Sequence, residues 1–388
     1  MIFSLLIKPA SADCNLRCRY CFYLDRSRLY PATSQHRMAE NVLERLIRSY
    51  LDSAQPVYSF VWQGGEPLLM GHPFFERVTD LQMAYARRGA EVSNAVQTNG
   101  MLLDDRLARH FRACRFLTGV SLDGPKRLHD AARLDAAGHG SHEAVVKGVE
   151  CLRRNHAEFN ILTLVSKHNV ATPVEIYDYL THEIGANFLQ FIECVELDGE
   201  GRVAPYCIEP REWGAFLCEV FDRWYEKKDT RKISVRLFDT IIAKLVTGVD
   251  ICCTAGSDCR QYFVVEYNGD VYPCDFHVLP ELRLGNVLTH TWDELADSAM
   301  FKEFGARKRE THSACGSCPY FRFCAGDCPK NRVGHTGVSA NKLSYLCEGW
   351  RIFYGHTLTR FEKLAATVRS EECGRKVFSR HDQGGNFT

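Results

Sequence analysis

Cys14-Asn-Leu-Arg-Cys18-Arg-Tyr-Cys21 places three thiols on one short loop, with three and then two residues between them. The loop follows an apolar run, Phe3–Ile7, that we interpret as a buried strand. A loop with this spacing can bind three corners of a cubane iron–sulfur cluster and leave the fourth iron open. The alternative is a zinc site in which three cysteines share the metal with a distant fourth ligand. The spacing, with a tyrosine before the last cysteine, favours the cluster.

Around this loop, short apolar runs alternate with longer amphipathic stretches from residue 1 to about residue 225. The expected strands are Phe3–Ile7, Tyr58–Trp62, Glu91–Gln97, Thr118–Leu122, Phe159–Leu164 and Phe188–Phe191. The expected helices between them include Glu40–Ser53, Phe74–Gly89 and Thr172–Leu180. This alternation predicts parallel βαβ units and an α/β fold, an incomplete (β/α)6 barrel. Active sites of such barrels are built from the loops after the strands, so the cysteine loop is expected at the barrel mouth.

The composition changes near residue 251, where cysteines become frequent. Phe263–Tyr272 carries Asn268-Gly269 between two apolar runs, which predicts a hairpin with a tight turn. Before it, 211–248 reads as two helices separated by a short strand at Ser234–Leu237. The expected division is a barrel over 1–225, a helical connection over 226–250, a cysteine-rich domain over 251–350, and a C-terminal helix with a polar tail over 351–388.

Eight cysteines of the second region have ligand-like spacing: Cys253, Cys259, Cys274, Cys315, Cys318, Cys324, Cys328 and Cys347. Eight thiols are enough for two cubane clusters with four ligands each. Two tetrahedral zinc sites need the same number, so the ligand count leaves both possibilities open.

Composition excludes several other classes of protein. The chain has 388 residues, of which 45% are hydrophobic, and its 48 basic side chains balance 48 acidic ones. Zero net charge gives no reason to expect nucleic acid or a membrane surface as partner. No apolar run is long enough to span a bilayer, and Met1–Ile7 lacks the flanks of a signal peptide. Eighteen cysteines in tight clusters, without an export signal, predict metal or iron–sulfur ligation in a reducing cytoplasm.

Three further stretches give the sequence a resemblance to the radical S-adenosylmethionine superfamily: Gln63-Gly-Gly-Glu-Pro67, Ser121-Leu-Asp-Gly-Pro125 and Leu189–Val195. The resemblance implies that the open iron chelates S-adenosylmethionine. It also implies that Ser121 and Arg133 hold the carboxylate of this cofactor, and that Val195 packs on its adenine. The residues it places at the cofactor are Tyr20, Gly64, Gly65, Glu66, Ser121, Arg133 and Val195. The alternatives without a cofactor are that Arg133 is an exposed helix residue and that 189–195 is an ordinary strand of the barrel core.

The second cysteine region resembles the SPASM domain of peptide-modifying radical enzymes. This resemblance implies two auxiliary [4Fe–4S] clusters, and therefore three clusters in the whole chain. By the same resemblance the nearer auxiliary cluster is bound by Cys253, Cys259, Cys274 and Cys328. The farther one is bound by Cys315, Cys318, Cys324 and Cys347. Cys252 is left out, because the spacing to Cys259 matches the family only from Cys253.

The resemblance narrows to the anaerobic sulfatase-maturating enzymes. It rests on Ile7-Lys-Pro-Ala-Ser11, Cys21-Phe-Tyr23, Gln63–Pro67, Leu103-Asp-Asp, Ser121–Lys126 and Tyr272-Pro-Cys-Asp-Phe276. Such enzymes oxidise a cysteine or serine of a sulfatase to Cα-formylglycine. Asp275 matches the base that removes the substrate proton, and its alternative reading is a turn residue. The implied partners are an unfolded or nascent sulfatase polypeptide and an electron donor such as flavodoxin or ferredoxin.

Other functions remain open at this point. Another SPASM peptide maturase, which forms thioether or carbon–carbon cross-links, often carries an extra N-terminal module. We expect no such module, because the first strand begins within a few residues of Met1. An electron carrier has no use for an open iron, and a zinc-binding regulator would be colourless. The sequence leaves open whether the target is cysteine or serine, and the glycine-rich stretch Glu196–Tyr206 departs from the relatives.

Overall fold

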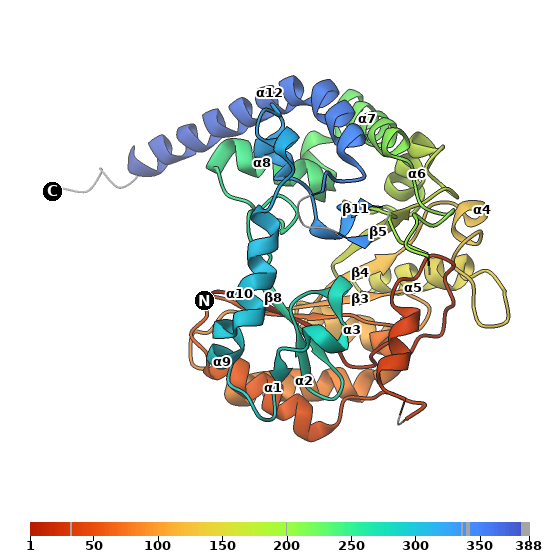
Figure 1. Ribbon diagram of the computed structural model, residues 1–388, viewed down its shortest axis with the longest axis vertical. Helices are drawn as coiled ribbons and strands as arrows, with labels where there is room; N and C mark the ends of the chain where they lie inside the picture. The colour runs from red at the N-terminus through yellow and green to blue at the C-terminus, as the bar shows by residue number, and fades with distance from the viewer. Residues whose placement is uncertain (32, 199, 335–336, 339–341, 382–388) are drawn as a thin grey trace.

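The computed structural model describes residues 1–31, 33–198, 200–334, 337–338 and 342–381. Seven parallel strands form most of one open sheet, with helices between them (Figure 1). The strands are β1 (Ser4–Lys8), β2 (Tyr58–Trp62), β3 (Val92–Thr98), β4 (Leu117–Ser121), β5 (Phe159–Val165), β6 (Phe188–Glu193) and β7 (Ser234–Val235). The predicted α/β fold is confirmed, and the sheet is open as expected of an incomplete barrel.

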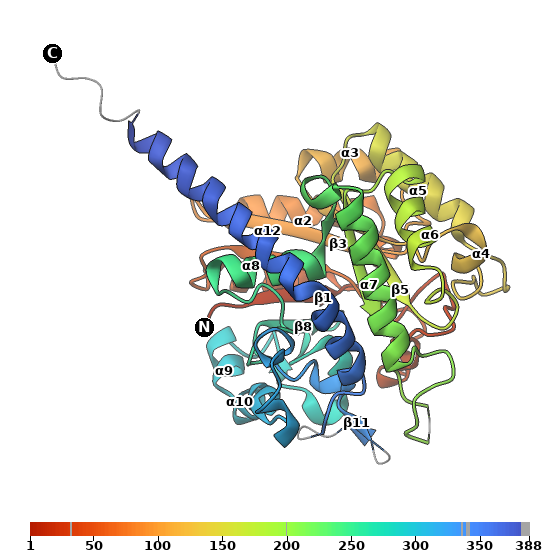
Figure 2. The same ribbon diagram turned by 90° about the horizontal axis from the view of Figure 1, so that it is seen from above.

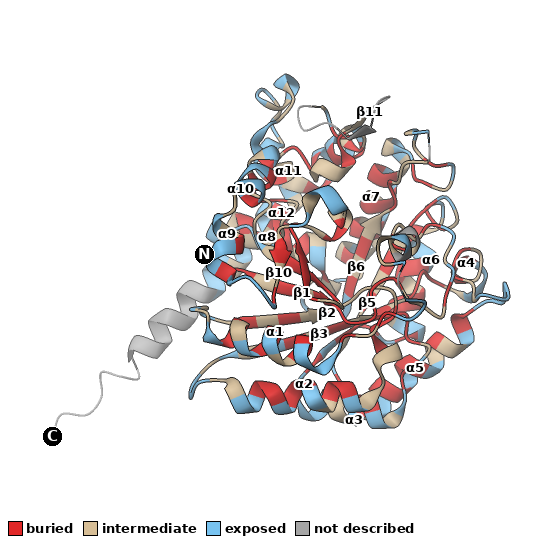
Figure 3. Cartoon of the chain, turned by 60° about the horizontal axis from the view of Figure 1, so that its bottom comes forward, coloured by how far each residue is buried: buried red, intermediate tan, exposed pale blue. Residues whose placement is uncertain are grey.

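Helices cover the outer face of this sheet. They are α1 (Glu40–Asp52), α2 (His72–Tyr85), α3 (Asp105–Ala113), α4 (Lys126–His129), α5 (His142–Arg154), α6 (Pro173–Asp178), α7 (Pro210–Glu226) and α8 (Arg236–Thr247). Their inner faces are buried and their outer faces exposed, as Figure 3 shows. The predicted helix at Thr172–Leu180 is only partly regular, because α6 passes into a π-helical turn at Tyr179–Glu183.

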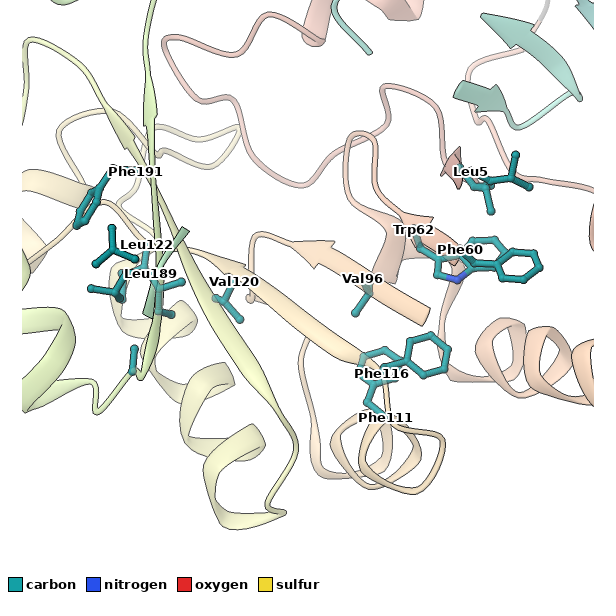
Figure 4. Packing of buried hydrophobic residues seen from close by; sticks show 14 of the residues in the cluster. Leu5, Phe60, Trp62, Val96, Phe111, Phe116, Val120, Leu122, Leu189 and Phe191 are labelled. Carbon is teal, nitrogen blue, oxygen red and sulfur yellow. The ribbon is translucent and has the colours of Figure 1, made fainter. Parts of the chain in front are cut away.

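Aromatic and branched side chains explain why the strands stay together. Phe60 and Trp62 of β2 are fully buried and pair in register with Leu5 and Ile7 of β1. Figure 4 shows how these and other apolar side chains fill the space between strands and helices. Alternate residues of each strand point to the same face, so one apolar side buries itself against the helices.

The first strand of the predicted hairpin joins the sheet beside β1. β8 (Tyr262–Glu266) lies parallel to β1, with Lys8 opposite Glu266, and then pairs antiparallel with β9 (Asp270–Tyr272) (Figure 2). β10 (Gly285–Asn286) completes the order β10-β9-β8-β1-β2-β3-β4-β5-β6-β7. Gly269 occupies the turn with φ +87°, which favours glycine. The cysteine-rich segment therefore begins inside the barrel sheet and not as a detached unit.

The rest of the chain consists of short elements and one long helix. The short ones are α9 (Trp292–Asp297), α10 (Ala299–Ala306), α11 (Phe321–Cys324), β11 (Val333–Gly334) and β12 (Gly337–Val338). The long helix α12 (Cys347–His381) packs on α7 and α8 and then extends away from the body (Figures 1 and 2). The end of the predicted polar tail, 382–388, lies outside the described residues. Within the described part of the chain, no helix combines the length and apolarity needed to cross a bilayer.

Candidate functional site

The loop after β1 gathers the first three cysteines. The backbone N–H of Leu16 donates to Cys14 Sγ at 3.3 Å, and Asn99 Nδ2 donates to the same sulfur at 3.7 Å. The pKa of Cys14 is raised to about 11 and that of Cys18 to about 12, mainly by burial and in smaller part by the negative charge of Cys21. These thiols therefore hold their protons unless a cation joins them, as iron does when it binds thiolates.

The two glycines after β2 pack against the start of this loop. Gly65 N donates to Ser11 O at 2.7 Å, and Glu66 N donates to Asp13 O at 2.8 Å. A Cβ on Gly65 would lie 2.1 Å from Asp13 O, so only glycine allows this contact. Gly64 has φ +144°, and a Cβ there would lie 2.8 Å from Ser11 O. The glycines thus allow close packing against the backbone that leads into the cysteine loop. Their contact with a cofactor stays a prediction.

Glu66 is fully buried, and protein groups occupy both of its carboxylate oxygens. Oε1 accepts from Leu68 N at 2.9 Å and from Thr98 Oγ1 at 2.8 Å. Oε2 accepts from Asn99 N at 2.7 Å. Burial raises the pKa of this carboxyl group to about 7, while the three hydrogen bonds oppose the rise. Glu66 therefore fixes the end of β3 at the site, and the structure assigns it a supporting role besides the predicted one.

Arg133 is buried and held by a carboxylate that the sequence analysis left without a role. Its Nε donates to Asp123 Oδ2 at 2.9 Å, and its Nη2 donates to Asp123 Oδ1 at 3.2 Å. Tyr20 donates its hydroxyl to Oδ2 of the same carboxylate, and the guanidinium lies 5.4 Å from the centroid of the Tyr20 ring. The alternative of an exposed helix arginine is wrong, because Arg133 is only 9% exposed.

Ser121 and Val195 lie at the carboxyl ends of β4 and β6, the two strands on either side of β5. Ser121 ends β4, and its Oγ accepts from Gln97 Nε2 at 3.2 Å. Val195 follows the end of β6 by two residues and is buried. Their predicted contacts with the cofactor remain predictions, but both stand at the edge of the sheet that carries the cysteine loop.

Asp275 begins a short 3₁₀ turn after the β8–β9 hairpin and is buried. Its Oδ1 lies 2.5 Å from Lys8 Nζ, and its Oδ2 accepts from Gln63 Nε2 at 3.2 Å. Lys8 is the last residue of β1, six positions before Cys14, so these contacts bring Asp275 to the edge of the sheet that holds the first cysteine loop. Sequence reasoning missed Lys8; its signal was a lysine that ends an otherwise apolar strand.

The eight cysteines of the second region come together in two groups. In one group, the negative charge of Cys274 contributes to raising the pKa of both Cys253 and Cys328. The charge of Cys259 likewise contributes to raising the pKa of Cys274. In the other group, four thiols line one cavity of about 230 Å³: Cys315, Cys318, Cys324 and Cys347. Cys252 shares a hydrogen bond with Cys253, which lowers the pKa of Cys252 to about 5. Which thiols bind which cluster stays a prediction.

A separate cavity of about 300 Å³ lies between the barrel and the cysteine-rich region. Glu193 of β6, Cys253, Phe276 and Lys330 are among its lining residues. Burial raises the pKa of Glu193 to about 7, and the negative charge of Asp327 adds to the rise. The cavity therefore reaches from the second cysteine region to the carboxyl end of β6.

Known proteins match this architecture and much of this sequence. Residues 9–180 match the radical SAM superfamily, and residues 253–319 match the iron–sulfur cluster-binding domain named SPASM. The serine-type anaerobic sulfatase-maturating enzyme of Bacteroides thetaiotaomicron is 36% identical and covers 96% of this chain and 94% of its own. This chain belongs to the anaerobic sulfatase-maturating enzymes. The family predicted from the sequence is thereby confirmed.

Other members of the anaerobic sulfatase-maturating enzymes agree over nearly the whole length. The cysteine-type enzyme of Clostridium perfringens is 36% identical and covers 94% of this chain and 99% of its own. A solved structure described as native anSMEcpe with bound AdoMet and Cp18Cys peptide superposes with a TM-score of 0.88 at 35% identity. It covers 95% of this chain and 100% of its own.

As a radical SAM enzyme with a SPASM domain, the chain binds S-adenosylmethionine and [4Fe–4S] clusters, as predicted. The donor set fits these groups. Three thiols on one loop would hold three irons of a cluster and leave one for the cofactor, and backbone N–H groups of Tyr23 and Leu24 favour the thiolate of Cys21. The eight thiols of the second region are enough for two further clusters.

Proposed function

We propose that this enzyme oxidises a cysteine or a serine of a sulfatase polypeptide to Cα-formylglycine. The observation that carries the proposal is the near full-length similarity, at 36% identity, to both a serine-type and a cysteine-type sulfatase-maturating enzyme. When bound, S-adenosylmethionine at the first cluster supplies the radical that takes a hydrogen atom from the substrate Cβ, and the auxiliary clusters supply an acceptor for the remaining electron.

Asp275 is the proposed base for the substrate thiol or hydroxyl proton. It stands next to Cys274, is 7% exposed, and has its two oxygens held by Lys8 and Gln63. A carboxylate is a weak base for a thiol with a reference pKa of about 8.5. Proton transfer to Asp275 is therefore expected to occur together with oxidation of the substrate carbon and not before it.

Arg133 and Ser121 are proposed to bind the carboxylate of S-adenosylmethionine. A guanidinium already held by Asp123 and Tyr20 keeps its orientation, which lowers the cost of ordering it when the cofactor binds. Val195 offers an apolar surface suited to one face of adenine. The proposed ligands of the clusters are the eleven cysteines named from the sequence.

The proposed partners are an unfolded or nascent sulfatase polypeptide and a small electron-transfer protein such as flavodoxin or ferredoxin. The proposed compartment is the cytoplasm, where thiols stay reduced and can bind clusters. A net charge of zero gives no support to nucleic acid or to a membrane surface as a partner.

The test is anaerobic incubation of the cluster-loaded protein with S-adenosylmethionine, a strong reductant and a peptide that carries Cys-x-Pro-x-Arg. A serine version runs alongside, and a version with alanine at the target position is the control. Mass spectrometry is expected to show conversion of the cysteine peptide, the serine peptide or both to formylglycine, with no change in the alanine peptide. Formation of 5′-deoxyadenosine with both peptides unchanged would reject sulfatase maturation in favour of another peptide substrate.

A further inference from the structure

Lys8 is a buried cation that contacts Asp275. It ends β1, is 1% exposed, and places its Nζ 2.5 Å from Asp275 Oδ1. The same ammonium lies 3.7 Å from the centroid of the Tyr23 ring. Moving an ammonium group from water into a protein interior is strongly unfavourable unless anions and hydrogen bonds compensate the lost hydration. A chain that keeps a lysine here therefore has a use for its charge.

A second buried carboxylate also acts on Lys8. Glu266 of β8 is the register partner of Lys8 and is fully buried. Burial raises the pKa of Glu266, and the positive charge of Lys8 opposes the rise. Tyr23 donates its hydroxyl to Glu266 Oε1 and so holds this carboxylate in place. The positive charge of Lys8 thus balances two buried carboxylates. Of these two, only Asp275 is next in sequence to a predicted cluster ligand, Cys274.

The elements that carry this group are rigid. Lys8 and Glu266 face each other on paired strands in the middle of the sheet order, and Gln63 directly follows β2. Asp275, in contrast, lies outside the strands, at the start of a short 3₁₀ turn of three residues. Two side chains therefore determine where the carboxylate of Asp275 points: the ammonium of Lys8 forms an ion pair with Oδ1, and Gln63 Nε2 donates to Oδ2.

We propose that Lys8 is a positioning residue for Asp275, and that Glu266 and Tyr23 hold Lys8 in its place. The inference rests on the proposed function, because it concerns the base of that reaction. Lys8 exchanges no proton or electron in this scheme: the substrate proton still goes to Asp275. Catalysis by a base depends on its geometry, and a displacement of about 1 Å can cost about 100-fold in rate.

The experiment compares Lys8→Met, Glu266→Gln and the double variant with the parent enzyme. Lys8→Met alone leaves two buried carboxylates without their cation and can impair folding. The double variant removes one cation and one anion, so the charge balance of the buried group is restored. Lys302→Met is the matched control, because Lys302 forms an ion pair with Asp297 on the surface. Iron content and absorbance near 400 nm report cluster loading in every variant.

For the double variant we expect full cluster loading, a kcat for peptide oxidation about 100-fold below the parent, and a peptide KM within about threefold of it. The ratio of 5′-deoxyadenosine to formylglycine should rise at least about tenfold, because radicals form without productive proton transfer. Lys8→Arg keeps the charge but not the shape, so we expect it to recover only part of the rate. Lys302→Met should behave as the parent.

Three results would overturn the inference. A double variant with a kcat near that of the parent would show that Lys8 serves charge balance only. A raised KM with unchanged kcat would make Lys8 a peptide-binding residue. Loss of clusters in every Lys8 variant would assign the residue to folding. If the parent itself oxidised neither peptide, the proposed function would fail first, and the role of Lys8 would fall with it.

Discussion

Two buried ion pairs lie at the mouth of the barrel. In one pair the carboxylate is proposed to orient the cation, and in the other the cation is proposed to orient the carboxylate. On the β4 side, Asp123 is the anchor: it accepts two bonds from Arg133, one from Tyr20 and one from Leu164 N at 3.0 Å. On the β1 side, the cation Lys8 is the anchor, and the carboxylate of Asp275 is the proposed working group. In the proposed roles, Asp123 orients Arg133 for the cofactor, and Lys8 orients Asp275 for the substrate.

The kind of cation in each pair follows from its duty. A guanidinium is planar and can use one edge on Asp123 while another edge binds a carboxylate, as the proposed contact with S-adenosylmethionine requires. An ammonium is a compact charge, and that of Lys8, a residue only 1% exposed, contacts Asp275 and the ring of Tyr23. The two pairs therefore divide the site into a proposed cofactor end and a proposed substrate end, and variants should affect the two ends separately.

The largest effect is expected at the substrate end. Asp275→Asn keeps the size of the side chain but removes the base, so formylglycine formation should fall about 1,000-fold. Cleavage of S-adenosylmethionine should continue, because that step does not use Asp275. Mass spectrometry of the peptide and chromatography of 5′-deoxyadenosine measure the two products. Asp270→Asn is the control, a buried carboxylate on the same hairpin that pairs with Arg283. Aldehyde formation at the rate of the parent would remove Asp275 from the mechanism.

A smaller effect is expected at the cofactor end. Arg133→Lys keeps the charge but cannot bridge Asp123 and a second carboxylate, so we expect the Kd for S-adenosylmethionine to rise about tenfold. The peptide KM should stay near that of the parent. Anaerobic equilibrium dialysis measures the Kd, and Arg127→Lys, which changes an exposed arginine paired with Glu175, is the control. An unchanged Kd would mean that Arg133 only supports the fold.

The difference between the two pairs also explains what the sequence revealed. Arg133 lies near the motif Ser121–Pro125, so the family resemblance pointed to it from the sequence, and its contact with the cofactor stays a prediction. Lys8 and Asp275 meet only because β8 inserts beside β1, a pairing between distant segments that no local pattern predicts. The six strands were predictable because each carries its own apolar periodicity. The burial of Lys8 was not, because it depends on partners from the other end of the fold.

Glu66 is a third buried ionisable group of the site, and among the described residues its carboxyl group has three hydrogen bonds and no ion pair. Burial raises its pKa from the usual 4.5 to about 7, so the folded protein binds a proton more tightly than the unfolded chain between these values. Stability supplied by that proton is present at low pH and is lost as the pH rises through about 7. From pH 6 to pH 8 the parent should lose about 1 kcal/mol relative to Glu66→Gln, whose amide does not titrate.

Thermal unfolding of the cluster-loaded parent and of Glu66→Gln at several pH values measures this difference. Glu66→Gln is expected to have the lower Tm throughout, because an amide nitrogen cannot accept the bond from Asn99 N. The gap between the two proteins should narrow as the pH rises, by a degree or two on the scale of about 2 °C per kcal/mol. A gap that is constant from pH 6 to pH 8 would mean that the carboxylate is already ionised at pH 6. In that case three hydrogen bonds would stabilise a buried charge without any counter-ion, and the ion pairs of Lys8 and Arg133 would owe their presence to orientation alone.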